Sequence, residues 1–182
     1  MYQKVSTAIF VILVAHMELP ERLFPALHVD SYRIRDFLNT KEDIWTYNTT
    51  KTNVIRCRYD LMRFIEGMFI SFNRTMLNGR RRIGVELLGQ FSRRRLGRMY
   101  VFREGHPLSI ETLTYKAPDC SCGVVVVRSL TQGTTYVDLR VRNSFIRDGP
   151  RYECRREFSR ITHYGRVIYS SDCSQHLRNT LV

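Results

Sequence analysis

Lysine, proline and glycine are scarce in this chain of 182 residues. Only four of its 29 Lys and Arg residues are lysine, and it contains five prolines and ten glycines. So little proline and glycine excludes a collagen-like or low-complexity chain. No segment reaches the roughly 20 apolar residues that a membrane-spanning helix requires, so no membrane span is expected. A hydrophobic content of 43% excludes general disorder and, at this length, indicates one domain with a sizeable core.

Signatures of catalysis and metal binding are also missing from the sequence. It has no nucleophile elbow, and no His pair follows Cys120-Ser-Cys122 at the spacing of a zinc finger. The histidines are scattered, and no nucleic-acid-binding motif accompanies the formal charge of +12. We therefore expect a protein that is not an enzyme and that uses no metal, cofactor or nucleic-acid partner.

The N-terminal segment predicts secretion. Lys4 supplies a positive charge before the apolar run 5–15, which is too short to span a bilayer and is typical of a secretory signal peptide. Ala15 suits the end of the signal, but Leu13 is large for its place, so the cleavage site stays open. The alternative is a buried N-terminal strand. We expect a signal at residues 1–15 and a single extracellular, monomeric domain at 16–182.

The cysteines and two sequence triplets suit an oxidising compartment. Five cysteines allow two disulfides and leave one cysteine over, and after secretion they are disulfide candidates before they are metal ligands. Asn48 and Asn73 each begin an N-x-T triplet and are candidate glycosylation sites.

Alternation of apolar and polar residues predicts a mainly β fold. A short helix is expected at 31–39, and a second helix is expected after Asp148-Gly149-Pro150, with Cys154 and Phe158 on one face. Eight strands lie between the helices. This pattern favours a closed antiparallel barrel of eight strands, which has room for one small ligand, with the second helix packed outside. The expected strands are 44–50, 55–61, 68–72, 83–87, 98–103, 109–115, 122–129 and 134–142.

Several short segments carry a family resemblance through their order and spacing. Glu42-Asp43-Ile44-Trp45 precedes a strand with Cys57, and Cys122 begins an aliphatic run. Further segments follow: Tyr136-Val137-Asp138-Leu139-Arg140-Val141, Gly149-Pro150, Cys154 with Phe158, and Val167-Ile168-Tyr169-Ser170-Ser171-Asp172-Cys173. Together they resemble the tick salivary lipocalins of the histamine-binding family.

The resemblance implies a pairing of the cysteines. Cys57 would pair with Cys173, and Cys122 would pair with Cys154. Cys120 is then unpaired, and it could be free, replace Cys122 in its bridge, or join two chains.

The resemblance also implies a binding site for a protonated biogenic amine inside the barrel. Glu42, Trp45 and Asp138 match the acidic and aromatic contacts, and a buried ammonium needs such a carboxylate and favours an aromatic face. Trp45 could instead plug one end of the barrel. Three positions depart from the family pattern: Asn39 replaces a tyrosine, Gly123 replaces an aspartate and Arg140 replaces an aromatic residue.

Arg140 opens an alternative ligand class. It shares one strand face with Asp138, so both point inward or both point outward. Alternation leaves the two orientations open, and the resemblance favours the inward one. An inward Arg140 would neutralise Asp138 and suit a lipid carboxylate, such as a fatty acid or eicosanoid. Either ordinary barrel core or a lipid pocket could be formed by Phe72, Tyr100, Phe102 and Tyr115.

Two arginine triplets suggest a third function. Arg80–Arg82 and Arg93–Arg95 could form a surface patch for an anionic glycan or a protein, or they could simply be solvated loops of a basic protein. The sequence thus leaves three hypotheses: scavenging of histamine or serotonin to evade host defence, binding of a lipid mediator, and a surface binding module.

Overall fold

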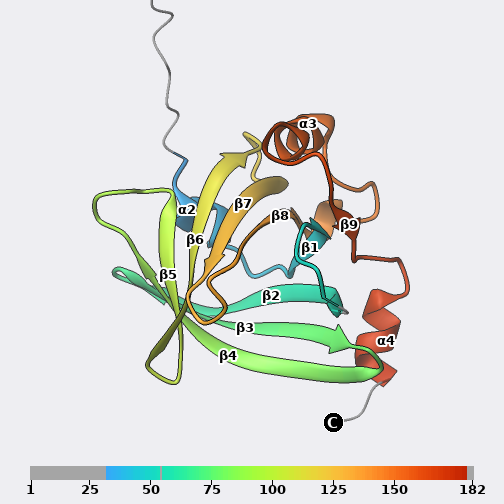
Figure 1. Ribbon diagram of the computed structural model, residues 1–182, viewed down its shortest axis with the longest axis horizontal. Helices are drawn as coiled ribbons and strands as arrows, with labels where there is room; N and C mark the ends of the chain where they lie inside the picture. Colours follow the sequence, from blue (N-terminus) through green and yellow to red (C-terminus); the bar gives the residue numbers. More distant parts are fainter. Residues whose placement is uncertain (1–31, 54, 180–182) are drawn as a thin grey trace, which may run out of the picture. The chain divides into compact units, whose positions relative to one another are not determined.

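A closed antiparallel β-barrel of eight strands forms the body of the molecule (Figure 1). The computed structural model describes residues 32–53 and 55–179, so the expected signal at 1–15 lies outside the described residues. The sheet order is β2-β3-β4-β5-β6-β7-β8-β1, and pairing of Ile44 with Asp60 closes the barrel between β1 and β2. The strands are β1 Ile44–Thr49, β2 Ile55–Glu66, β3 Phe69–Asn78, β4 Arg81–Phe91, β5 Arg98–Arg103, β6 His106–Lys116, β7 Cys122–Ser129 and β8 Thr135–Arg142.

Helix α2 (Ile34–Leu38) closes one end of the barrel. Ile34 and Phe37 are fully buried against residues of the barrel interior. The backbone N–H of Ile34 donates to the carbonyl oxygen of Leu96 at 3.1 Å, and Arg142 donates to the carbonyl oxygen of Phe37 at 2.9 Å. These hydrogen bonds hold the helix on the barrel rim. They are needed because a five-residue helix has little stability of its own.

The C-terminal segment packs on the outside of the barrel. It contains helix α3 (Tyr152–Ile161), the short strand β9 (Arg166–Val167) beside β1, and helix α4 (Cys173–Asn179). Phe158 of α3 lies in an outer core with Val124, whereas Val125 faces the barrel interior. Both faces of β7 are apolar because one packs on the barrel interior and the other is covered by α3. The predicted barrel, the short helix before it and the helix outside it are confirmed, whereas α4 was not predicted.

Two disulfides hold this C-terminal segment in place. Cys57–Cys173 joins β2 to the start of α4, and Cys122–Cys154 joins β7 to α3, as the resemblance implied. Cys120 is free and half-buried. None of the helices that the structure describes is long and apolar enough to cross a membrane.

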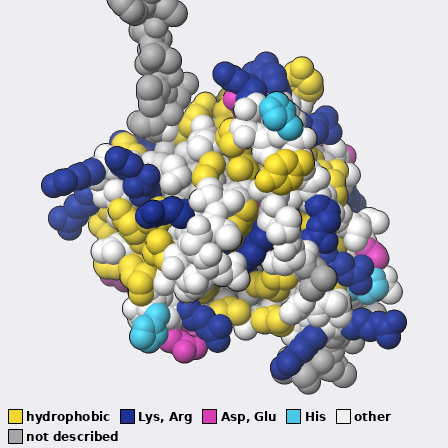
Figure 2. All heavy atoms as spheres, in the orientation of Figure 1, with side chains coloured by type: hydrophobic (Ala, Val, Ile, Leu, Met, Phe, Trp, Pro, Cys, Tyr) yellow, Lys and Arg dark blue, Asp and Glu magenta, His cyan; other side chains and the backbone are white. Residues whose placement is uncertain are grey.

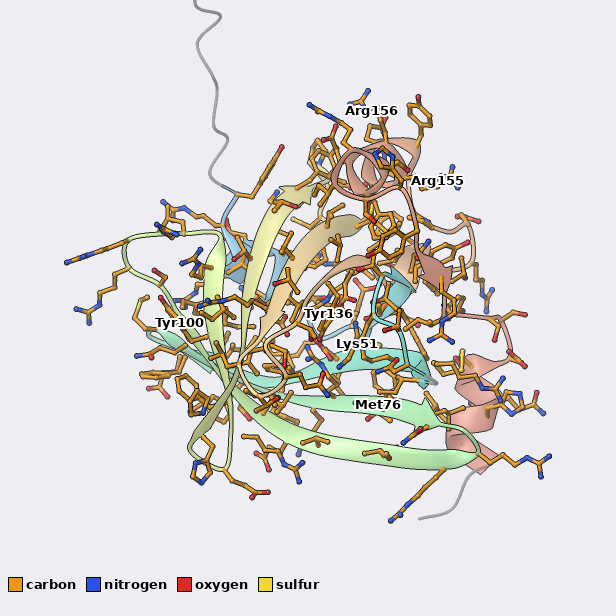
Figure 3. All side chains as sticks on the ribbon, in the orientation of Figure 1. Lys51, Met76, Tyr100, Tyr136, Arg155 and Arg156 are labelled. Atoms are coloured by element: carbon orange, nitrogen blue, oxygen red, sulfur yellow. A yellow bond between two sulfur atoms is a disulfide. The ribbon has the colours of Figure 1, made fainter. Side chains whose placement is uncertain are left out.

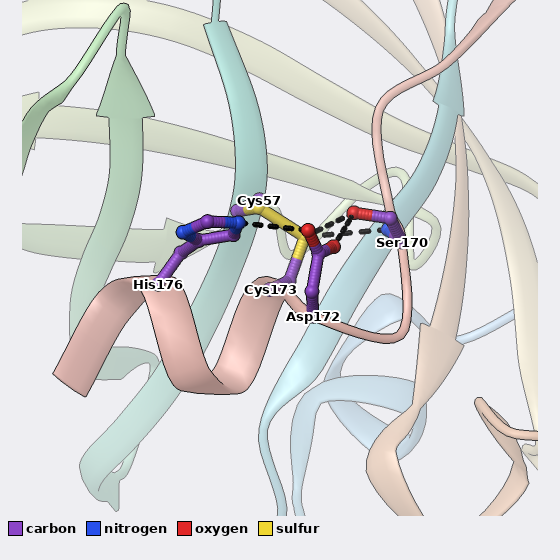
Figure 4. Close-up of a disulfide and its surroundings, with 5 residues drawn as sticks. All are labelled: Cys57, Ser170, Asp172, Cys173 and His176. Carbon is purple, nitrogen blue, oxygen red and sulfur yellow. Dashed lines mark hydrogen bonds and ion pairs between the residues drawn. A yellow bond between two sulfur atoms is a disulfide. The ribbon is translucent and has the colours of Figure 1, made fainter. Parts of the chain in front are cut away.

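Polar contacts around the first disulfide support the beginning of α4 (Figure 4). Asp172 accepts hydrogen bonds from the hydroxyl of Ser170 and, at 2.7 Å, pairs with Nε2 of His176. The carboxylate therefore stands between the hydroxyl and the imidazole. In a catalytic triad the imidazole takes the middle place, so this arrangement has the order of a helix support and not that of a triad.

Candidate functional site

Six charged side chains meet inside the barrel, and we call them the interior ion cluster. Each has less than 10% of its side chain exposed. They come from four strands: Arg58 and Asp60 of β2, Arg74 of β3, Glu111 of β6, and Asp138 and Arg140 of β8.

Strand alternation carries these side chains inward. On β8, Asp138 and Arg140 are buried inside, and Leu139 between them belongs to the outer core. Of the two orientations that the sequence left open, the polar face of β8 is thus the inward one. On β2, Cys57 has a φ of 51° and the register shifts there, so that Cys57 reaches Cys173 outside while Arg58 faces inside.

Asp138 has three partners in the cluster. Its Oδ1 accepts a hydrogen bond from Thr49 Oγ1 at 2.7 Å, and its Oδ2 accepts from Arg140 Nη2 at 3.1 Å and from Arg58. Arg58 is also fixed by Thr46, whose Oγ1 accepts from Nε at 3.0 Å. The charge of Asp138 is therefore neutralised by two arginines, Arg58 and Arg140. Neutralisation by Arg140 was expected if its side chain points inward.

The other two carboxylates are equally well paired. Glu111 accepts from Arg140 Nη1 at 2.7 Å and from Arg74 Nη2 at 2.9 Å. Asp60 accepts two hydrogen bonds from Arg74, both at 2.7 Å. Three arginines thus balance three carboxylates in a connected network, which is the condition for a tolerable buried ion cluster.

Electrostatics keeps the carboxylates of Glu111 and Asp138 ionised. Burial by itself would raise the pKa of Glu111 and of Asp138. The guanidinium groups of Arg140 and Arg74 around Glu111, and of Arg58 and Arg140 around Asp138, outweigh burial and hold both pKa values below their ordinary range. The cluster consequently carries no net charge at neutral pH.

Little space remains between the cluster and α2. The cavity bounded by Leu38, Asp60 and Met99 has a volume of about 10 Å³. That is about the space that one water molecule needs. A small ligand can therefore enter this part of the barrel only if side chains move.

Lys51 and Tyr136 cover the cluster at the end of the barrel away from α2. Lys51 follows the end of β1, whereas α2 lies before its beginning. The ammonium of Lys51 lies 4.9 Å from the ring centre of Tyr136, and Figure 3 shows the two side chains together. Burial and the nearby Arg58 lower the pKa of Lys51. No carboxylate lies within ion-pair distance of Lys51 among residues 32–53 and 55–179, although the charge of Asp138 acts on it and raises its pKa. Lys51 therefore adds one positive charge to a neutral cluster.

Glu42 and Trp45, the other two implied amine contacts, lie outside the interior. Glu42 accepts the backbone N–H of Ser144 at 2.7 Å. The side chain of Ser144 lowers the pKa of Glu42 most, and this backbone hydrogen bond lowers it further. Trp45 points outward because its neighbours on β1, Ile44 and Thr46, point inward. Its Nε1 donates to Asn143 Oδ1 at 2.9 Å, and its ring packs against Tyr59 and Tyr169. The structure therefore does not bring Glu42 and Trp45 together with Asp138, and Trp45 belongs to the outer core and does not plug the barrel.

The remaining predicted contacts also lie away from the cluster. Asn39 is exposed at the end of α2. Tyr100 points outward, since Met99 and Val101 on either side of it point inward. Tyr115 contacts the outer core and makes an edge-to-face contact with Tyr32, with the two ring centroids 5.6 Å apart.

At Gly123 an aspartate would be crowded by its neighbours. A Cβ there would lie 3.0 Å from the Leu113 side chain and 3.3 Å from the Phe37 ring. Phe37 of helix α2 thus occupies part of the space into which a carboxylate would project. This departure from the amine-binding pattern follows from packing.

The candidate glycan acceptors both lie within paired strands. Asn48 of β1 is placed between β8 and β9, and its amide oxygen is buried. Asn73 of β3 is half-buried between β2 and β4.

The two arginine triplets do not form one patch. Arg80–Arg82 lies at the start of β4, and Arg93–Arg95 follows its end. Ten residues, of which nine belong to β4, separate Arg82 from Arg93, and an extended chain of this length spans about 35 Å. The expectation of a joint patch is therefore wrong.

Sequence reasoning missed five residues of this site: Lys51, Arg58, Asp60, Arg74 and Glu111. The sequence signal that could have found them is a set of charged residues on several strands, in which arginines and acidic residues are equal in number. On β2 the alternation was visible, but it does not say which face is buried.

Solved structures with the same fold are lipocalins. The serotonin complex of AM182 matches with a TM-score of 0.59 and 17% identity, over 78% of this chain and 92% of that chain. Japanin from Rhipicephalus appendiculatus, bound to cholesterol, matches with a TM-score of 0.55 and 8% identity, over 72% and 95% of the two chains. Lobster apocrustacyanin A1 matches with a TM-score of 0.51 and 12% identity, over 75% and 81%. The chain therefore has the lipocalin fold.

Comparisons by sequence give no match of this kind. No protein-family model matches the chain, and no curated protein matches it.

Proposed function

We propose that this protein is a secreted lipocalin that binds a small amphiphilic ligand with an anionic head group, such as a fatty acid or an eicosanoid. It would act by stoichiometric capture, without turnover. The observation that carries the proposal is the ammonium of Lys51, which is half-buried above the cluster and has no carboxylate within ion-pair distance among the described side chains.

The charge balance favours an anion at this end of the barrel. The interior ion cluster is neutral by itself, so a ligand carboxylate beside Lys51 would complete an ion pair that the protein leaves open. Arg140, which the sequence suggested for this role, is occupied by Glu111 and Asp138. The role passes to Lys51 for that reason.

Apolar side chains are available near Lys51 for the ligand's tail. Val85 and Leu108 are only partly buried, and both pack against the interior core. They lie near the β3–β4 and β5–β6 turns, on the same side of the barrel as Lys51. Binding would displace Tyr136, because its ring covers the cluster there.

Calorimetric titration of the oxidised, delipidated protein with arachidonate tests the proposal. The wild type is expected to bind one equivalent, and Lys51→Gln should weaken binding at least tenfold. Lys41→Gln removes an exposed lysine and is the matched control, expected to leave affinity unchanged. Absence of binding, or equal loss in the two variants, would overturn the proposal.

A biogenic amine is the second candidate ligand. Three carboxylates lie inside the barrel, and a ligand ammonium could take the place of Arg140 on Asp138. AM182, which shares the fold, forms a complex with serotonin. If this candidate is correct, the wild type binds serotonin or histamine, Asp138→Asn abolishes that binding, and arachidonate does not bind.

Secretion and a role in evading host defence complete the proposal. Two disulfides support an oxidising compartment, and the role rests on the resemblance to tick salivary lipocalins. Expression in insect cells should release a product into the medium whose N-terminus follows residue 15. An uncleaved product retained in the cells would contradict secretion.

A further inference from the structure

A groove on the outer wall of the barrel is separate from the interior site. It has a volume of about 940 Å³ and lies over the adjacent strands β2 to β5. Its apolar lining is unusually exposed: Phe64 is 52% exposed, Phe69 42% and Leu88 41%. Contiguous exposed apolar side chains on a soluble protein mark interaction sites.

Register explains how these side chains gather. Phe69 pairs with Gln90, which pairs with Tyr100, so that one row crosses three strands. The next row contains Phe64 of β2 and Leu88 of β4, joined through Ser71 of β3. Their neighbours Leu87 and Phe91 point into the barrel, so the two rows belong to its outer face.

Positive charge borders the groove on one side. Arg93 and Arg94 of the β4–β5 loop line it, and both are exposed. Neither has an ion-pair partner within the described part of the chain. Figure 2 shows Lys and Arg side chains next to hydrophobic ones over this loop, at the left of the molecule. Glu66 is the acidic residue of the lining.

We propose that this groove binds a segment of a partner protein in which apolar or aromatic side chains stand next to acidic ones. The apolar side chains would enter the groove, and the acidic ones would pair with Arg93 and Arg94. In the rows under the groove β3, β4 and β5 are paired on both sides, whereas β2 beyond Asp60 is paired with β3 alone. Over β3 to β5, recognition therefore uses side chains and not the addition of a strand.

The shape of the surface favours a peptide segment over a lipid surface. A bilayer is flat and is contacted by protruding apolar side chains, whereas these side chains line a hollow. The volume of the groove lies in the range of sites that enclose a compact ligand or a few side chains.

Selection of twelve-residue peptides on phage tests the proposal with the full oxidised protein as bait. Enriched sequences should combine Asp or Glu with Leu, Phe, Tyr or Trp. Synthetic peptides from the selection should bind the Arg93→Glu/Arg94→Glu variant and the Phe69→Ser variant at least tenfold more weakly. The matched control is Arg80→Glu/Arg81→Glu, which makes the same charge change at the other end of β4 and should bind like the wild type.

Two results would overturn the proposal. One is an enriched set without acidic residues, or with equal affinity for the wild type and for both groove variants. The other is sedimentation with vesicles of phosphatidylcholine and phosphatidylserine that depends on the same residues while no peptide is enriched. Arachidonate titration of each variant should match the wild type, which shows that the barrel is intact and separates this site from the interior one.

Discussion

Replacing Arg140 by methionine is the most direct perturbation of the interior ion cluster. Arg140 is 1% exposed and bonds to Glu111 at 2.7 Å and to Asp138 at 3.1 Å. Methionine keeps much of the aliphatic volume but removes the charge. The cluster then holds two positive and three negative groups, so one buried carboxylate lacks its counter-charge.

The expected loss in the free energy of unfolding is about 3 kcal/mol. Removing one partner of a buried ion pair usually costs 3–5 kcal/mol, since the remaining charge is left uncompensated. The lower end applies here because Glu111 keeps Arg74 and Asp138 keeps Arg58. Adding Glu111→Gln to Arg140→Met restores the balance, so the double variant should lose about 2 kcal/mol less than the sum of the single variants.

The pH dependence gives a second, independent measure. In the wild type, the lowered pKa values of Glu111 and Asp138 contribute stability that is complete above their unfolded values near pH 4. That contribution is lost as the pH falls through the folded values. In Arg140→Met one carboxyl group has a raised pKa, and its protonation relieves the excess charge. The stability gap between the two proteins should therefore narrow from pH 7 to pH 4.

Urea unfolding followed by tryptophan fluorescence, with the disulfides intact, measures both quantities. A loss below 1 kcal/mol at pH 7 would refute the reasoning, and so would a gap that widens as the pH falls. Lys51→Met is the control, because Lys51 has no carboxylate partner within the described chain, and its removal should cost little stability.

Two further predictions concern helix α2 and the disulfides. Phe37→Ala should lower the free energy of unfolding by about 3–5 kcal/mol, because its ring is fully buried at the barrel end, and a loss below 1 kcal/mol in urea would contradict this. Replacing Cys57 and Cys173 by serine should cost about 5 kcal/mol, against about 4 kcal/mol for Cys122 and Cys154, since the first bridge spans 116 residues and the second 32. Thermal unfolding of the two double variants checks this order, and a lower Tm for the second would reverse it.

The sequence predicted the number and order of the barrel strands because period-two alternation is a local property, but β2, β3 and β4 are much longer than the expected 55–61, 68–72 and 83–87. Strands 98–103 and 122–129 have the predicted bounds. Helix α4 was missed because only Cys173 and Leu177 of its residues are buried apolar positions. Its place depends on a disulfide to a strand that is 116 residues away.

The site was harder to predict, because its charges neutralise one another across strands. Alternation identifies which residues share a face, but not which face is buried. Arg58 and Asp60 look like a solvated face when β2 is considered alone. They are stable inside only because Asp138 and Arg74 approach from β8 and β3. For the same reason, the resemblance could match Trp45 to a family position without showing that its side chain faces outward in this protein.

The charge at the Lys51 end leads to a last prediction, on the pH dependence of ligand binding. Burial and Arg58 lower the pKa of Lys51, so its positive charge is lost at a lower pH than that of an ordinary lysine. Arachidonate affinity should therefore fall as the pH rises through the lowered pKa of Lys51. Lys51→Arg keeps its charge over this range and should bind with an affinity that does not change with pH. If the wild type and Lys51→Arg show the same pH profile, the head group of arachidonate does not lie at Lys51.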